Sequence, residues 1–192
     1  MATRRIAWTN IKPWLIGIVL STAAMFLGYN FGSDTARLLG GEPGIWARLG
    51  KGLVWGGMIA ALQWPIVRTV SVLPVRFLLA SAFGFAVGYP LGQTIQAIIT
   101  VHWSLNLVGY WLAVATFGLS VGVPQWLIFR RHMRRASLWV LCSVIGWMLA
   151  GAVWLSSRAG DGLDAMVYGI VTGLGLVWLV HLQPPKMKVA ES

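Results

Sequence analysis

Residues 77–129 read FLLASAFGFAVGYPLGQTIQAIITVHWSLNLVGYWLAVATFGLSVGVPQWLIF and contain no Asp, Glu, Lys or Arg. Soluble domains have about one charged residue in four. A helix needs about 20 apolar residues to cross the hydrocarbon core of a bilayer. The stretch therefore has the length of two membrane spans and a connector, which we place at 93–106, where Gln, His and Trp favour the membrane interface.

The rest of the chain is also rich in hydrophobic residues and poor in charged ones. Its 192 residues are 57% hydrophobic and 10% charged, with a mean hydropathy of +0.73. Six apolar stretches can be drawn, at 14–32, 52–67, 77–92, 107–129, 138–156 and 165–182. The second is short, and we expect either that Lys51 and Arg68 at its ends extend their side chains to the interface or that the bilayer is thinner there. The sequence predicts one all-α integral membrane domain over 1–192, with about six transmembrane helices.

Basic residues are distributed unevenly between the two ends of these stretches. Eleven of the fifteen Lys and Arg residues lie on one side, at 4, 5, 12, 68, 76, 130, 131, 134, 135, 186 and 188. The other side has Arg37, Arg48, Lys51 and Arg158. Because cytoplasmic loops are enriched in Lys and Arg, we predict a multi-pass protein of the plasma (inner) membrane with both termini in the cytoplasm. We expect the first stretch to be a retained helix, since it continues past the small residues at 21–24.

An internal repeat is the most specific signal in the sequence. The segment QWPIVR at 63–68 recurs as QWLIFR at 125–130. The segment GYNFG at 28–32 resembles GYPLG at 88–92, at nearly the same offset. These offsets predict three helical hairpins at about 10–68, 72–130 and 136–182, the third with a weaker match. Each hairpin enters and leaves on the same side, so the predicted axis that relates them runs along the membrane normal.

Small residues recur every three or four positions in most of the apolar stretches. Such spacing places them on one helix face, where they allow neighbouring helices to approach closely. The predicted packing residues are Gly56, Ala60, Gly84, Gly88, Gly118, Gly122, Gly146 and Ala150. We expect at least one small-residue face to point outward, towards a neighbouring protein. The candidates are the face of Ala80, Gly84 and Gly88 and the face of Cys142, Gly146 and Ala150.

The repeated segments also carry the candidate binding residues. Gln63 and Gln125 are amides inside the predicted spans, and each is followed by a tryptophan and an arginine. We consider two roles: a hydrogen bond between helices, and a polar binding site near the predicted axis. The candidate binding set is Gln63, Gln125, Trp64, Trp126, Arg68 and Arg130.

Two further residue types have a predicted place at the membrane surface. The basic run of Arg130, Arg131, Arg134 and Arg135 predicts contact with anionic lipid or with a partner protein. Eleven of the twelve tryptophans lie near predicted span ends, where they would anchor the helices, and only Trp147 is predicted to lie deep.

Catalytic signatures are missing from the sequence. It has no phosphate-binding glycine loop with lysine and no His-Glu-x-x-His motif, and its single cysteine excludes a site built from several cysteines. We expect no enzyme activity, no metal site and no nucleic-acid partner, and the cofactor is unknown. The leading hypothesis is an accessory subunit of a larger membrane complex or homo-oligomer. The alternatives are a small-molecule carrier or substrate-binding component with a separate energising partner, and a pigment- or quinone-associated protein.

Overall fold

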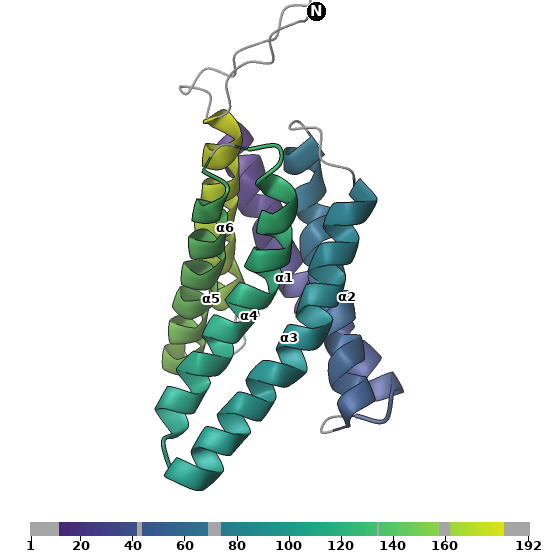
Figure 1. Ribbon diagram of the computed structural model, residues 1–192, viewed down its shortest axis with the longest axis vertical. Helices are drawn as coiled ribbons and strands as arrows, with labels where there is room; N and C mark the ends of the chain where they lie inside the picture. The colour runs from purple at the N-terminus through teal and green to yellow at the C-terminus, as the bar shows by residue number, and fades with distance from the viewer. Residues whose placement is uncertain (1–11, 42–43, 69–73, 134, 158–161, 183–192) are drawn as a thin grey trace, which may run out of the picture.

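The computed structural model describes residues 12–41, 44–68, 74–133, 135–157 and 162–182, and these form an all-helical bundle (Figure 1). The six helices are α1 (Lys12–Leu38), α2 (Ile45–Val67), α3 (Pro74–Trp103), α4 (Asn106–Phe129), α5 (Ser137–Ser157) and α6 (Leu163–His181). Five are long and apolar enough to cross a membrane. The exception is α2, which has Arg48 and Lys51 in its first half. The predicted class, a helical membrane protein, agrees with these helices.

The helix boundaries follow from local sequence. Pro13 occupies the second position of α1 and Pro74 the first of α3, where a missing amide hydrogen costs nothing. Gly162 has a φ of 75° and directly precedes α6, a conformation that only glycine adopts without strain. Pro65, Pro90 and Pro124 lie inside helices. Such prolines are tolerated in membrane helices, where neighbouring groups compensate for the lost hydrogen bond.

The connector predicted at 93–106 is wrong for most of its length. Helix α3 continues without a break to Trp103, and the turn is confined to Ser104 and Leu105. Ser104 has a φ of 55°, which ends the helix. Gln93 and Gln96 are polar, but neither breaks a helix, and both line a pocket inside the bundle.

The six helices form a closed ring. Each helix packs against its neighbours in the sequence, and α6 packs against α1 to complete the circle. Figure 1 shows the helices running alternately up and down, so that the first turn of α1 and the last turn of α6 lie at the same end. The turns between α1 and α2 and between α3 and α4 lie at the opposite end. We call this the hairpin end.

Glycines make the contacts between neighbouring helices close. A Cβ on Gly56 of α2 would collide with the backbone of Ser81 on α3, and one on Gly118 of α4 would lie 2.6 Å from the Cα of Val144 on α5. The ring closes in the same way, because a Cβ on Gly173 of α6 would collide with the backbone of α1. Small residues therefore serve contacts within this chain.

The two faces expected to point outward point to neighbouring helices of the same chain. A Cβ on Gly84 or Gly88 would collide with Ser120 of α4. A Cβ on Gly146 would lie 2.9 Å from the Cγ2 of Thr172 on α6. The outward prediction was wrong because the closed ring gives each helix two neighbours, and the small-residue faces lie against them.

The interior of the ring is filled by two hydrophobic clusters. One lies towards the ends of α2, α4 and α6 that face away from the hairpin end, and Phe77, Phe129 and Trp139 are its largest side chains. The other lies towards the hairpin end and includes Trp55, Phe85 and further aromatic residues. The first cluster closes the ring at one end, and the second forms the floor of the pocket at the other.

Candidate ligand-binding pocket

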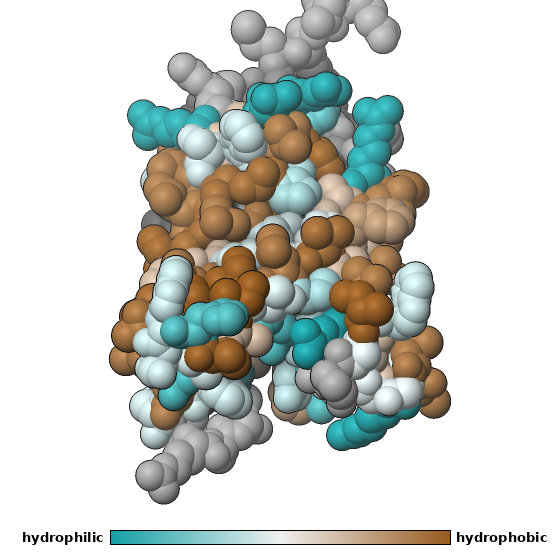
Figure 2. Space-filling model, turned by 60° about the horizontal axis from the view of Figure 1, so that its bottom comes forward, coloured by the Kyte–Doolittle hydropathy of each residue, from teal (hydrophilic) through white to brown (hydrophobic). Residues whose placement is uncertain are grey.

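A pocket of about 460 Å³ lies inside the ring at the hairpin end. Figure 2 looks towards this end and shows polar surface within a depression between apolar lobes. All six helices contribute to the lining, which consists of Met25, Phe26, Tyr29, Asn30, Lys51, Trp55, Tyr89, Gln93, Gln96, Tyr110, Val114, Phe117, Trp147, Ala150, Gly151, Trp154, Gly162, Asp164 and Ala165. The volume falls in the range of about 300–1,000 Å³ that is typical of small-molecule sites.

Aromatic rings form the floor of this pocket. The ring of Trp55 lies 5.2 Å from that of Phe85 and 5.2 Å from that of Trp147, measured between centroids. Phe117 lies 5.7 Å from Phe85, and Trp147 lies 5.5 Å from Tyr168. These edge-on contacts are a favourable arrangement for aromatic pairs. The floor is therefore a layer of packed aromatic rings beneath a more polar wall.

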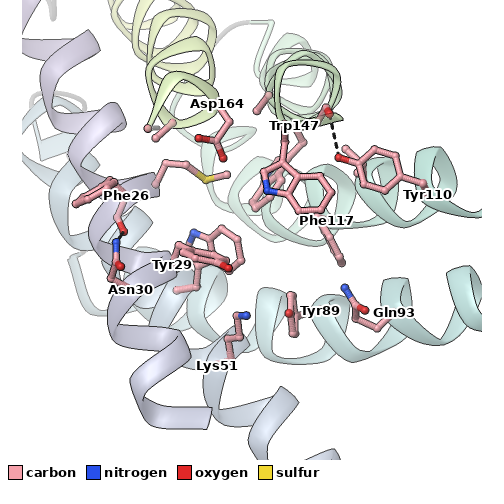
Figure 3. A pocket seen from close by; sticks show the side chains of 18 of the residues that line it. Phe26, Tyr29, Asn30, Lys51, Tyr89, Gln93, Tyr110, Phe117, Trp147 and Asp164 are labelled. Carbon is pink, nitrogen blue, oxygen red and sulfur yellow. Dashed lines mark hydrogen bonds between the residues drawn. The ribbon is translucent and has the colours of Figure 1, made fainter. Parts of the chain in front are cut away.

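Lys51 is the most informative residue of the wall. Its side chain is only 6% exposed. The Nζ atom lies 4.8 Å from the ring centroid of Tyr29 and 5.1 Å from that of Tyr89. A Cβ on Gly32 would lie 2.9 Å from the Lys51 carbonyl, so α1 and α2 are in close contact here. The expectation that Lys51 extends outward to the interface is wrong, because its side chain points into the pocket between two aromatic rings (Figure 3).

Asp164 gives the pocket a second charge of opposite sign. It lies in the first turn of α6 and is half-buried. Figure 3 shows Asp164 and Lys51 on opposite sides of the pocket, with aromatic side chains between them. Gln93 on the wall adds an amide group. Tyr110 donates a hydrogen bond of 3.0 Å from its hydroxyl to the Gly151 carbonyl, which fixes its ring at the pocket wall.

Two buried hydrogen-bond donors of the lining have no protein partner within the described part of the chain. They are the indole N–H groups of Trp55 and Trp147, whose side chains are 5% and 4% exposed. Leaving a buried donor unsatisfied costs about 1–3 kcal/mol. These two donors, in a pocket that Lys51 also lines, could donate to a hydrogen-bond acceptor of a ligand.

The repeated glutamines lie outside this pocket lining. Gln63 and Gln125 are fully buried. The Gln63 amide donates a hydrogen bond of 3.3 Å to the hydroxyl of Ser21, and the Gln125 amide donates one of 2.7 Å to the hydroxyl of Ser81. Trp139 donates a further hydrogen bond of 2.6 Å from its indole to the Gln125 carbonyl oxygen. Both glutamines thus make the hydrogen bonds between helices that were one of their two predicted roles.

The other predicted site residues lie at the end of the ring opposite the pocket. Trp64 and Trp126 are partly buried against the first hydrophobic cluster. The Arg130 guanidinium lies 5.4 Å from the ring centroid of Trp126. Arg68, Arg130, Arg131 and Arg135 are exposed, and Arg134 lies outside the described residues.

Sequence reasoning placed Trp55, Trp139 and Lys51 at the membrane interface, whereas all three are buried. Lys51 lies four residues before Trp55, so both side chains are on the same helix face. The sequence relates the two residues to each other, but only the burial of Trp55 in the structure shows that this face points inward.

Comparisons with protein-family models, with curated proteins and with solved structures find no match to this chain. Among the described residues, no group of three or more His, Cys, Asp or Glu side chains could hold a metal ion. The pocket must therefore be interpreted from its own chemistry.

Proposed function

We propose that this chain is a small-molecule carrier, or a substrate-binding membrane component that works with a separate energising partner. The observation that carries the proposal is the pocket at the hairpin end, whose lining includes buried Lys51 and two unpartnered indole donors. Buried hydrogen-bond donors without a partner are costly for folding alone. Ionisable residues inside membrane proteins commonly mark paths and sites for substrates.

The pocket is closed on one side, as a carrier in one of its end states requires. The aromatic floor and the cluster around Phe77, Phe129 and Trp139 fill the ring beyond it. If the termini are cytoplasmic, as the distribution of basic residues predicts, the pocket opens to the outer side of the plasma (inner) membrane. In that orientation the site would capture a substrate from outside the cell.

The proposal includes the arrangement of three hairpins about the membrane normal. It is supported by equivalent residues that meet in the pocket floor. The offset that relates the two QW segments also pairs Trp55 with Phe117 and Phe85 with Trp147, and all four aromatic residues lie in this part of the ring. In a structure solved in lipid nanodiscs, rotation about the membrane normal should superpose Gln63 on Gln125, whereas an in-plane axis would refute the arrangement.

An accessory subunit is the weaker proposal. It relied on small-residue faces that would be free to dock a neighbouring protein. Gly84, Gly88 and Gly146 instead approach helices of the same chain. A ligand pocket is also unnecessary for a protein whose role is packing.

The test is a ligand screen on the purified protein in lipid nanodiscs. Organic anions, cations, zwitterions, quinones and neutral solutes are compared by the shift that each produces in the unfolding temperature. A ligand present at 100 times its Kd stabilises the folded state by about 2.7 kcal/mol. We expect at least one class to produce such a shift. Uptake of the same compound into proteoliposomes then distinguishes a carrier, which works alone, from a binding component, which does not.

A pair of variants on α3 locates the binding. Gln93→Trp places a large ring in the pocket, while Leu91→Trp places the same ring on the outer face, where Leu91 is 50% exposed. The stabilisation should disappear in Gln93→Trp and persist in Leu91→Trp. The proposal fails if no class stabilises the protein, or if Gln93→Trp responds like the unmodified chain.

A further inference from the structure

We infer that the ligand of this pocket is a zwitterion, in which an alkylated ammonium group and an anionic group lie a few bonds apart. The inference rests on the proposed function and goes beyond it by naming the substrate class. It comes from the two opposite charges of the pocket, Lys51 and Asp164, and from the aromatic groups around each of them.

The Lys51 side of the pocket fits an anionic group. Lysine and the indole N–H are donors only, so each can serve an acceptor but not another donor. Lys51, Trp55 and Trp147 are all at least nine-tenths buried, and both indole donors are without a protein partner among the described residues. The rings of Trp55 and Trp147 lie 5.2 Å apart, and both line the pocket together with Lys51. A carboxylate or phosphate would accept hydrogen bonds from this group.

The Asp164 side fits a cation. Tyr110 and Trp154 stack with their centroids 6.0 Å apart and both line the pocket, as Asp164 does. Phe26 lies close to the start of α6, where a Cβ on Gly162 would be 3.9 Å from its ring. Aromatic faces attract ammonium groups most strongly when these are poorly hydrated, as alkylated ammonium groups are. The carboxylate of Asp164 adds the opposite charge.

A ligand with a single charge would match only half of this pocket. Binding displaces water from both walls, and a partly buried charge that loses water without gaining a partner is destabilised. An anion would desolvate Asp164, and a cation would desolvate Lys51. A zwitterion places a partner near each, and its own charges sum to zero, as those of Lys51 and Asp164 do.

The experiment compares trimethylglycine with two close analogues that have one charge each. 3,3-Dimethylbutyrate replaces the nitrogen of trimethylglycine by carbon and keeps the carboxylate, while choline keeps the ammonium and replaces the carboxylate by a hydroxymethyl group. Binding is followed by tryptophan fluorescence in nanodiscs of phosphatidylglycerol, which lack zwitterionic lipid. Glycerophosphocholine is included, because the same chemistry occurs in free solutes and in lipid headgroups. We expect at least one zwitterion to bind about ten-fold more tightly than either single-charge analogue.

Variants of the two charged residues give a second measurement, the relative affinity for choline and 3,3-dimethylbutyrate. Lys51→Met should shift the preference towards choline, and Asp164→Asn should shift it towards 3,3-dimethylbutyrate. Arg37→Met is the matched control, because Arg37 is an exposed cation near the same end, paired with Asp34 at 2.8 Å. It should leave the order of affinities unchanged.

The outcomes separate the two proposals. Binding of trimethylglycine identifies a free solute, and binding of glycerophosphocholine alone identifies a phosphocholine headgroup; both support a zwitterion. If 3,3-dimethylbutyrate or choline binds as tightly as the zwitterions, the inference is overturned, although the pocket remains a binding site. The inference is also overturned if Gln93→Trp abolishes the binding of a compound from another class and no zwitterion binds. If no compound of any class binds, the proposed function itself fails.

Discussion

Replacement of Gly84 by alanine tests whether the close contacts of the ring determine its stability. Gly84 lies on α3, where an added Cβ would collide with the backbone carbonyl of Ser120 on α4 and lie 2.8 Å from the Cγ of Pro124. Backbone atoms cannot move aside as the end of a flexible side chain can. To accept the methyl group, α3 and α4 must separate locally.

Gly57 on α2 provides the matched comparison. A Cβ there would meet only the Cβ of Ala82, at 3.9 Å, which is an ordinary contact. Alanine is favoured over glycine by about 1 kcal/mol in a helix interior, and this gain is common to both variants. Overpacking costs about 1–3 kcal/mol and applies to Gly84→Ala alone. Gly57→Ala should therefore be about 1 kcal/mol more stable than the parent, and Gly84→Ala from unchanged to about 2 kcal/mol less stable.

The difference between the two variants, about 1–3 kcal/mol, is the quantity to measure. Reversible unfolding by SDS in mixed micelles, followed by circular dichroism, gives the free energy of unfolding for each variant. If Gly84→Ala is as stable as Gly57→Ala, the contact between α3 and α4 is looser than described, and the account of the ring as a set of close glycine contacts is wrong.

Two further predictions concern the hydrogen bonds and the orientation. Trp139→Phe removes the indole that donates to the buried Gln125 carbonyl oxygen and should cost about 1–2 kcal/mol in the same unfolding assay, whereas Trp46→Phe, at a residue 72% exposed, should change little. Equal effects of the two changes would contradict the role given to Trp139. Reporter fusions at Arg131 should report the cytoplasm and those at Glu42 the outer side. A cytoplasmic report from Glu42 would reverse the orientation.

The class of the fold could be predicted because it depends on composition over long stretches. No charged residue occurs at 77–129, and this alone indicates helices in a membrane. The length of α3 could not be predicted in the same way. Gln93 and Gln96 indicate a connector only if polar residues are assumed to lie at the membrane surface. Both are helical and line an internal pocket, which is another environment where polar side chains are stable.

The candidate site was missed for a related reason. The position of Trp55, Trp139 or Lys51 along the sequence gives its approximate depth in the membrane, but not the direction in which it points around the helix axis. All three lie near the ends of the spans predicted from the sequence, and all three face the interior. The direction depends on which face each neighbouring helix covers, and thus on closure of the ring between α6 and α1.

The hydrogen-bond partners of the glutamines could have been found from the repeat. Ser21 and Ser81 are separated by the same offset that relates the GYNFG and GYPLG segments. Each serine accepts a hydrogen bond from the glutamine of the following helix. The Gln63 carbonyl oxygen has no partner among the described residues. Gln125 receives its second hydrogen bond from Trp139. The residue equivalent to Trp139 at the offset of the QW segments is Phe77, whose side chain has no hydrogen-bond donor.

The contact between α6 and α1 is the one contact of the ring between helices that no turn connects. It is as close as the others, since Gly173 lies against the backbone of Gly17 and Gly169 against that of Thr22. The turns therefore determine the order of the helices, while the glycine faces hold them together. A ring of this kind can gain or lose members only in pairs, because insertion of a single helix would invert every helix that follows it in the membrane.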